Sequence, residues 1–213
     1  MNKSSNSNLK PFTPEYWEES YRSGDMGWDL GGPTPIFDQW IGTCKEQLVI
    51  CILGAGNGWD AINFARRGHV VTAVDFAKLA TTNMLIAANK NHVKMDIRQM
   101  DIFDLNQIYE NHFDVVLEYT CYCAIDPNRR SDYLKMVYKI LKPGGEFVGL
   151  LFPTDKDPSE GGPPFAVQLG PTIELISEYF SLIKQEIPSL SVKPRSGREI
   201  FVIFKKSKNP QVS

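Results

Sequence analysis

Residues 51–75 read CILGAGNGWDAINFARRGHVVTAVD. An apolar run ends in three alternating glycines, a helix-like segment follows, and a second apolar run ends at Asp75. Glycines at a strand end let the backbone turn sharply and approach a ligand with no Cβ atom in the way. An acidic residue ending the next strand is placed to accept hydrogen bonds from ribose hydroxyls. The segment therefore predicts half of a nucleotide-type cofactor site.

The alternation of strand-like and helix-like segments continues outward from this stretch. Apolar runs predict seven strands, at residues 48–53, 70–74, 93–99, 113–119, 146–152, 182–187 and 199–204. Such alternation favours right-handed crossovers and a mostly parallel sheet with helices on both faces. The last two runs are joined by too short a loop for a parallel crossover, which predicts an antiparallel C-terminal hairpin. We predict a single-domain, Rossmann-like α/β fold.

Two helices have recognisable ends. Thr13 and Gly24 bracket the sequence PEYWEESYRS, with proline in its first turn. A second helix begins at Asp126 and precedes Gly144. Apolar residues recur in it at helical spacing, which predicts one buried face; they are Leu134, Val137, Tyr138 and Leu141.

Bulk properties limit the function classes. The 213 residues suit one domain, and a net charge of −2 disfavours a general nucleic-acid surface. No apolar run is long enough to span a membrane, and the polar N-terminus predicts no signal peptide. The four cysteines include no CxxC pair, which favours a cytoplasmic protein. We expect a disordered tail over 1–11, a domain over 12–206 (an N-terminal lid, 12–45, and a core, 46–206) and a polar tail over 207–213.

The spacing of the glycines separates two cofactor classes. A dinucleotide site expects GxGxxG, but the glycines here form GxGxG and the place of the third dinucleotide glycine holds Trp59. A bulky indole there disfavours pyrophosphate binding and an NAD-linked dehydrogenase. Asp75 alone does not decide between the two cofactor classes, because NAD enzymes use an acidic residue at the same place. After the third predicted strand comes Asp101, with Ile102 beside it; from position alone, Asp101 caps a helix or lies in a solvated loop.

The glycine loop resembles that of class I methyltransferases, which bind S-adenosylmethionine (SAM). This resemblance implies that Asp101 meets the adenine amino group and that the backbone amide of Ile102 faces a ring nitrogen. More specifically, the chain resembles the thiopurine S-methyltransferase family, and within it the plant-type halide and thiol (thiocyanate) methyltransferases. The resemblance covers roughly residues 12–206. It is carried by four segments: WEESYRSGDMGWDLGGPTP, FDVVLEYTCYCAIDPNRR, LKPGGEF and GGPPF.

The resemblance implies a set of residues around SAM and its product S-adenosylhomocysteine. Aromatic residues fold over the cofactor, whose sulfonium is attracted to aromatic faces. The implied cofactor residues are Trp17, Tyr21, Trp28, Gly54, Gly56, Gly58, Asp75, Phe76, Asp101, Ile102, Glu118 and Tyr119. Glu118 has a second interpretation, as a carboxylate that caps a helix or forms a salt bridge. The aromatic residues have one too, because they could simply pack an N-terminal helix onto the core.

A substrate pocket is expected beside the cofactor, near the ends of the fourth and fifth strands. Its candidates are Trp28, Tyr119, Tyr122, Phe152 and Phe165, each of which could equally be packing. Three departures from the family pattern stand out: Tyr21 where tryptophan is usual, GAGNG where GCGTG is common, and phenylalanine at 152 and 165 where relatives often have tyrosine. The last change predicts a more apolar pocket.

Direct transfer to a soft anion such as thiolate, thiocyanate or iodide needs alignment and exclusion of water rather than an acid or base. The three histidines precede predicted strands, at the edge opposite the cofactor, and no metal-ligand spacing occurs. Cys121 and Cys123 are expected to be structural thiols. Arg195 and Arg198, in the last hairpin, could attract an anion but are more simply solvated. We expect a small-molecule acceptor and neither a nucleic-acid nor a membrane partner; the alternatives are a metalloid or heterocyclic thiol acceptor, or a non-catalytic SAM sensor.

Overall fold

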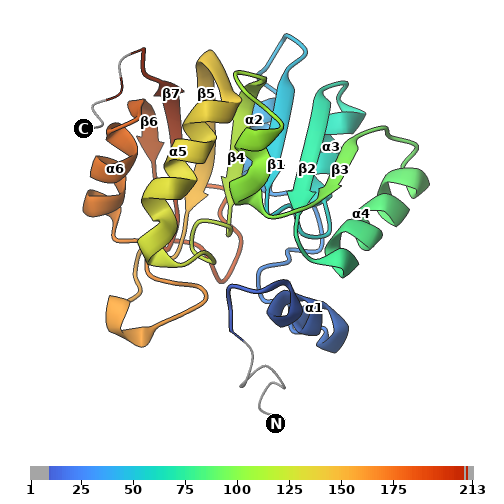
Figure 1. Ribbon diagram of the computed structural model, residues 1–213, viewed down its shortest axis with the longest axis horizontal. Coiled ribbons are helices and arrows are strands. Elements are labelled where there is room, and N and C mark those ends of the chain that lie inside the picture. Colours follow the sequence, from blue (N-terminus) through green and yellow to red (C-terminus); the bar gives the residue numbers. More distant parts are fainter. Residues whose placement is uncertain (1–9, 209, 211–213) are drawn as a thin grey trace.

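The computed structural model describes residues 10–208 and 210 of the chain. Seven strands form one sheet in the order β3-β2-β1-β4-β5-β7-β6 (Figure 1). They are β1 (Val49–Leu53), β2 (Val70–Asp75), β3 (Asp96–Gln99), β4 (Phe113–Tyr119), β5 (Leu141–Leu151), β6 (Phe180–Glu186) and β7 (Ile200–Lys206). The pairs among β1 to β5 are parallel, whereas β7 runs antiparallel to both β5 and β6. The predicted mostly parallel sheet with an antiparallel C-terminal hairpin is confirmed.

Helices cover both faces of the sheet, and the strand pattern explains why. Side chains alternate between faces along a strand, so Cys51 and Leu53 join one core cluster while Ile50 and Ile52 join the other. The first cluster includes residues of α5 (Arg130–Ile140) and α6 (Leu169–Ser177). The second includes residues of α2 (Pro35–Ile41), α3 (Trp59–Arg66) and α4 (Lys78–Lys90). Short 3-10 helices lie at η2 (Ile102–Gln107), η3 (Pro127–Arg129) and η4 (Pro158–Glu160).

Several strand boundaries differ from the expectation by one to five residues, and two of the differences concern the third strand and the second predicted helix. The third strand begins at Asp96 rather than at residue 93. The second predicted helix starts as η3, capped by the Asp126 side chain, and ends at Ile140, so Leu141 belongs to β5 and pairs with Phe113. Pro143 accounts for this early change, because the residue before a proline favours an extended backbone and helices end at or before it.

The strand order reverses direction at β1, which lies between β2 and β4. In such sheets the ligand site lies at the carboxyl ends of the strands at this switch point. The first helix, α1 (Pro14–Ser23), lies beyond that edge, near α4 (Figure 1). A hydrogen bond of 3.0 Å from the Leu79 backbone N–H to Glu18 Oε1 joins the two helices. In the described chain, no helix is long and apolar enough to cross a membrane.

Of the tail expected over 1–11, only residues 10 and 11 are among the described residues, and of the tail over 207–213 only 207, 208 and 210 are. The residues before α2, 10–34, are called the covering segment below. Within the expected 12–45 lid, α2 packs into the second core cluster, where Phe37 is fully buried.

Candidate cofactor and acceptor site

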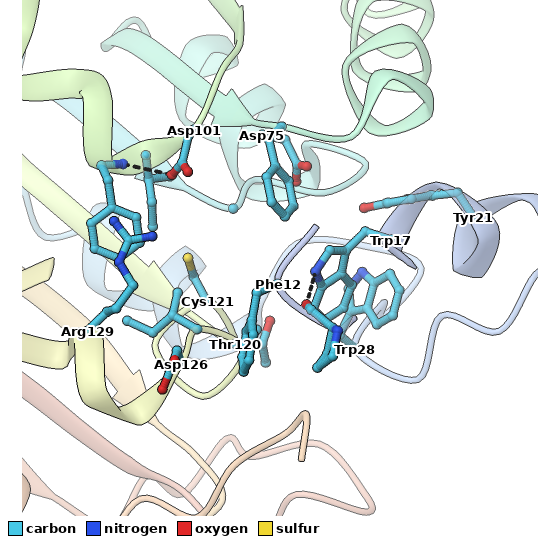
Figure 2. A pocket seen from close by; sticks show the side chains of 17 residues that line it. Phe12, Trp17, Tyr21, Trp28, Asp75, Asp101, Thr120, Cys121, Asp126 and Arg129 are labelled. Carbon is cyan, nitrogen blue, oxygen red and sulfur yellow. Dashed lines mark hydrogen bonds between the residues drawn. The ribbon is translucent and has the colours of Figure 1, made fainter. Parts of the chain in front are cut away.

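Two neighbouring cavities lie at the carboxyl edge of the sheet. The first is enclosed by the covering segment, the glycine loop and the segments after β2, β3 and β4 (Figure 2). The second lies between the covering segment and the glycine loop, against the ends of β1 and β4. Both are lined by Trp28, Gly54 and Thr120, so these residues mark where the two cavities meet.

Most of the predicted cofactor residues come together here. Those lining the first cavity are Trp17, Tyr21, Trp28, Gly54, Asp75, Phe76, Asp101 and Ile102. Gly56 and Tyr119 line the second cavity. Figure 2 shows Phe12, Trp17 and Trp28 from the covering segment on one side, and Asp75, Asp101 and Cys121 on the other. Residues far apart in the sequence thus form one enclosure.

The three glycines of the loop have different structural roles. Gly54 and Gly56 both have φ of +58°, which favours glycine. A Cβ atom on Gly54 would lie 3.1 Å from the Cys121 Cβ and Sγ atoms, and one on Gly56 would lie 3.3 Å from the Tyr21 hydroxyl. A Cβ on Gly58 would instead lie 2.2 Å from Met84 Cγ. Gly58, expected at the cofactor, therefore permits close packing of α3 on α4 and lines neither cavity.

Asp75 holds the glycine loop in place. Its Oδ2 atom accepts a hydrogen bond of 2.9 Å from the Gly56 backbone N–H, and Oδ1 accepts one of 2.9 Å from the Ala77 N–H. The side chain is buried, and burial raises the pKa of Asp75 to about 6, although backbone N–H groups of Ala77, Gly56 and Phe76 oppose the shift. Each carboxylate oxygen can still accept another bond.

Aromatic rings from the covering segment close the first cavity. The Trp17 and Trp28 rings meet edge to face at 5.1 Å, and Tyr21 and Trp28 do so at 5.6 Å. The Trp17 indole donates a 2.9 Å hydrogen bond to the Pro11 carbonyl, and Pro11 and Phe12 also line this cavity. This enclosure offers aromatic faces to a cation.

A carboxylate joins the covering segment to the glycine loop. Asp29 accepts a 2.8 Å hydrogen bond from the Trp59 indole at Oδ1 and another from the Asn57 amide at Oδ2. Trp59, predicted to exclude a pyrophosphate, thus also anchors the covering segment. The sequence alone gave no sign of this contact, because 30 residues separate its partners.

Asp101 combines its two predicted roles. Its Oδ1 accepts a 3.0 Å hydrogen bond from the Phe103 N–H and so caps η2, while the side chain also lines the first cavity. Beside it, the Arg129 guanidinium lies 3.4 Å from the centre of the Phe103 ring. Sequence reasoning missed several lining residues, namely Pro11, Phe12, Phe103, Thr120, Ala124, Ile125, Asp126 and Arg129. Asp126 and Arg129 lie in a segment that carried the resemblance, where only a helix start was assigned.

Glu118 does not line either cavity, contrary to its expected place at the cofactor. The Glu118 side chain is buried, with 1% of its surface exposed. Its Oε1 atom accepts hydrogen bonds from the Cys121 and Tyr122 N–H groups, at 3.1 and 2.7 Å, and its Oε2 atom accepts one from the Tyr133 hydroxyl. Burial raises the pKa of Glu118 to about 7, against the opposing effect of these donors. The alternative interpretation, a capping carboxylate, describes its geometry.

We therefore expect Glu118→Ala to lower the free energy of unfolding by about 3 kcal/mol or more, because it leaves three buried donors without an acceptor. Glu118→Gln should cost much less, since its amide oxygen can accept from both N–H groups. Urea unfolding of both variants measures the difference. Equal destabilisation by the two variants would contradict this role.

The predicted substrate residues divide into two groups. Tyr122 is 2% exposed and packs in the core under the Arg130 guanidinium, 4.6 Å from its ring centre, so it does not face the cavities. The Phe165 ring stacks on Phe12 at 5.8 Å. Phe152 packs against two arginines of the β6–β7 loop. Only Tyr119 and Trp28 among these candidates line a cavity.

Arg195 is buried, contrary to the expectation of a solvated hairpin arginine. It is 3% exposed, its Nη2 atom donates a 2.6 Å hydrogen bond to the Trp28 carbonyl, and its guanidinium lies 4.7 Å from the Tyr119 ring centre and 5.2 Å from that of Phe152. Arg198 instead pairs with Asp155 at the surface, at 2.7 Å. Arg195 thus places a positive charge directly behind two cavity residues.

The remaining candidate groups are cysteine thiols and histidine side chains. Cys121 lines the first cavity, but burial raises the pKa of its thiol well above the usual value, and burial raises that of Cys123 to about 12. Both thiols are free and protonated at neutral pH. His69 and His112 immediately precede β2 and β4, at the far edge of the sheet. Within residues 10–208 and 210, no cluster of three His, Cys, Asp or Glu side chains could hold a metal ion.

The chain is similar to known methyltransferases in sequence and in fold. A profile of the thiopurine S-methyltransferase family matches residues 12–206. The chain is 31% identical over 198 residues to "Probable thiol methyltransferase 2" of Arabidopsis thaliana, covering 90% of this chain and 84% of the relative. It is 28% identical to "Thiocyanate methyltransferase 1" of the same plant, covering 89% and 84%.

A solved structure shares the fold. Burkholderia thailandensis 1,6-didemethyltoxoflavin-N1-methyltransferase, with bound 1,6-didemethyltoxoflavin and S-adenosylhomocysteine, superposes with a TM-score of 0.74. The two are 20% identical, and the match covers 92% of this chain and 87% of that one. At this identity the likeness supports the fold alone.

Proposed function

The chain belongs to the thiopurine S-methyltransferase family and is a SAM-dependent methyltransferase; we propose that its methyl acceptor is a small, soft nucleophile of the thiol, thiocyanate or halide class. The printed activities of its relatives support this choice of acceptor. The buried Arg195 guanidinium is the observation that carries it: Arg195 lines neither cavity, but it contacts the Trp28 carbonyl and the Tyr119 ring, and a fixed positive charge there favours an anion, although the nearby Glu199 carboxylate offsets part of that charge.

The residues present fit SAM. Gly54 and Gly56 line space that a Cβ atom would partly fill, Asp75 has acceptor capacity for ribose hydroxyls, and the covering segment supplies aromatic faces. We assign Asp101 and the Ile102 backbone to the adenine, and Trp17, Tyr21 and Trp28 to the sulfonium end. Bound SAM supplies an electrophilic methyl group on a positively charged sulfur.

The chain's own contribution is then alignment and exclusion of water. The covering segment closes the first cavity with Phe12, Trp17 and Trp28, and Asp29 ties it to the glycine loop. Holding an acceptor in line with the methyl group can lower the barrier by several kcal/mol. An ionised acceptor needs no base for this step. The four free cysteines also support our assignment to a reducing, cytoplasmic compartment.

Turnover with a panel of acceptors tests the proposed function. The panel contains thiocyanate, iodide, hydrosulfide, an aromatic thiol and a thiopurine, each incubated with SAM while S-adenosylhomocysteine is measured. We expect turnover of the sulfur and halide nucleophiles, with their rank order giving the specificity. Cofactor binding without turnover of any panel member would overturn the proposed acceptor class.

The raised pKa of Asp75 predicts a pH dependence of cofactor affinity. Below about pH 6 the carboxyl takes up a proton and loses acceptor strength, so SAM affinity should fall by about tenfold for each further pH unit. Calorimetric titration between pH 5 and pH 8 measures this. Asp60 also has a pKa of about 6 because of burial and lines the second cavity, but both of its oxygens accept hydrogen bonds from Thr34. An Asp60→Asn variant should keep the same pH profile; loss of the profile in this variant would contradict the assignment to Asp75.

A further inference from the structure

A buried polar cluster lies behind Tyr119. The Tyr119 hydroxyl donates a 3.0 Å hydrogen bond to Glu199 Oε2, and Glu199 is 1% exposed. Glu199 Oε1 and Arg195 Nη1 are both buried and have no hydrogen-bond partner among the described residues. Buried polar atoms without partners are uncommon and call for an explanation such as a catalytic role or a bound water.

This cluster adjoins the proposed acceptor site. Tyr119 lines the second cavity together with Trp28 and Thr120, and the Arg195 guanidinium contacts the Tyr119 ring and the Trp28 carbonyl. Glu199 itself lines neither cavity, so it reaches the site only through Tyr119.

The proposed acceptors differ in one chemical respect. Thiocyanate and halide ions carry no proton at neutral pH, whereas an alkyl thiol is largely protonated and is a weak nucleophile until it loses its proton. An enzyme that methylates thiols gains from a group that accepts this proton, and anions make no use of one.

Resting on the function proposed above, we propose that Glu199, acting through the Tyr119 hydroxyl, takes up the proton of a thiol acceptor. The thiol S–H bond breaks as its proton passes to Tyr119 Oη, whose own proton moves along the existing hydrogen bond to Glu199 Oε2. The sulfur keeps the electron pair and forms the bond to the methyl group. Arg195 stabilises the developing thiolate, and Glu199 releases the proton to water after turnover.

The electrostatics around Glu199 suit this task. Burial raises the pKa of Glu199, while Ser191, Tyr119 and Arg195 oppose the rise. The neighbouring Arg198 is engaged with Asp155 at the surface. A raised pKa makes the carboxylate a better proton acceptor for a thiol, because transfer is most efficient when the two pKa values lie close together.

Glu199→Gln tests the proposal by comparing two acceptors in the same enzyme. At pH 7 the ratio of kcat/KM for ethanethiol to kcat/KM for thiocyanate should fall at least about tenfold. The fall should disappear as the pH approaches the pKa of the free thiol. Tyr119→Phe should lower the ratio in the same way and serves if Glu199→Gln does not fold. Glu186→Gln, an exposed glutamate of β6, is the matched control and should leave the ratio unchanged.

A second measurement reads proton transfer without turnover. Thiophenol is titrated into the enzyme with S-adenosylhomocysteine, below the pKa of the free thiol, and the ultraviolet absorbance of thiolate is followed. The wild type should bind thiolate and Glu199→Gln should bind mainly thiol. Two results would overturn the proposal while leaving the proposed function intact. One is an equal loss of kcat/KM for ethanethiol and for thiocyanate in Glu199→Gln, and the other is equal thiolate absorbance in Glu199→Gln and the wild type. Absence of turnover of either acceptor by the wild type would instead overturn the proposed function.

Discussion

Asp75→Asn is expected to raise the Kd for SAM about a hundredfold or more. The carboxylate accepts backbone N–H groups from Gly56 and Ala77 on separate oxygens. An asparagine has one acceptor oxygen, so its NH2 group would face one of these donors and the glycine loop would shift. Each hydrogen bond to a charged group contributes about 1.5–3 kcal/mol, and the loss of one bond here is compounded by weaker contacts to ribose.

Calorimetric titration of the variant with SAM measures this change. Asp96→Asn is the matched control, because Asp96 begins β3 and bonds the exposed Arg98 and the half-buried Tyr109. The control should bind SAM as the wild type does. Unchanged affinity in Asp75→Asn would show that this carboxylate neither orders the loop nor contacts the cofactor.

Gly54→Ala is expected to lower the affinity for SAM at least thirtyfold. A residue with a Cβ atom at a positive φ costs about 1–2 kcal/mol in backbone strain. The new Cβ would also lie 3.1 Å from the Cys121 Cβ and Sγ atoms, where both residues line the first cavity. Strain and crowding therefore act together at the cavity wall.

Gly68→Ala is the control that separates a loss of cofactor affinity from a general loss of stability. Gly68 has a φ of +90° and no atom within 4 Å of an added Cβ, and it lies before β2 at the far edge of the sheet. Thermal unfolding should show destabilisation in both variants, and more in Gly54→Ala because it adds crowding to strain. SAM titration should show an affinity loss in Gly54→Ala alone; a similar loss in both would assign the effect to general instability.

Features encoded in consecutive residues were predictable from sequence. The β1–α3–β2 unit follows from apolar runs, glycines and a short spacing, and the structure confirms it. Gly54, Gly56 and Asp75 lie together at the carboxyl edge of the sheet. The C-terminal hairpin follows from loop length in the same way. Such signals are local, so one sequence suffices to interpret them.

Features that depend on tertiary packing were not predictable. Nothing in the sequence near Arg195 shows that it is buried under the covering segment, 167 residues away from Trp28. Glu118 follows the rule in part: the Cys121 and Tyr122 N–H donors are close in sequence and fit the predicted capping role, but only the fold brings the Tyr133 hydroxyl of α5 to it. Gly58 belongs to the glycine pattern but faces Met84 of α4, which only the packing of the two helices shows.

Transfer of a labelled methyl group tests the central claim most directly. The enzyme is incubated with SAM carrying a deuterated methyl group and with thiocyanate, and the products are analysed by mass spectrometry. The account predicts deuterated methyl thiocyanate and S-adenosylhomocysteine in equal amounts, with about tenfold less product from Asp75→Asn at a SAM concentration about ten times the wild-type Kd. Label that stays on the cofactor with thiocyanate and with every other soft nucleophile would contradict the account.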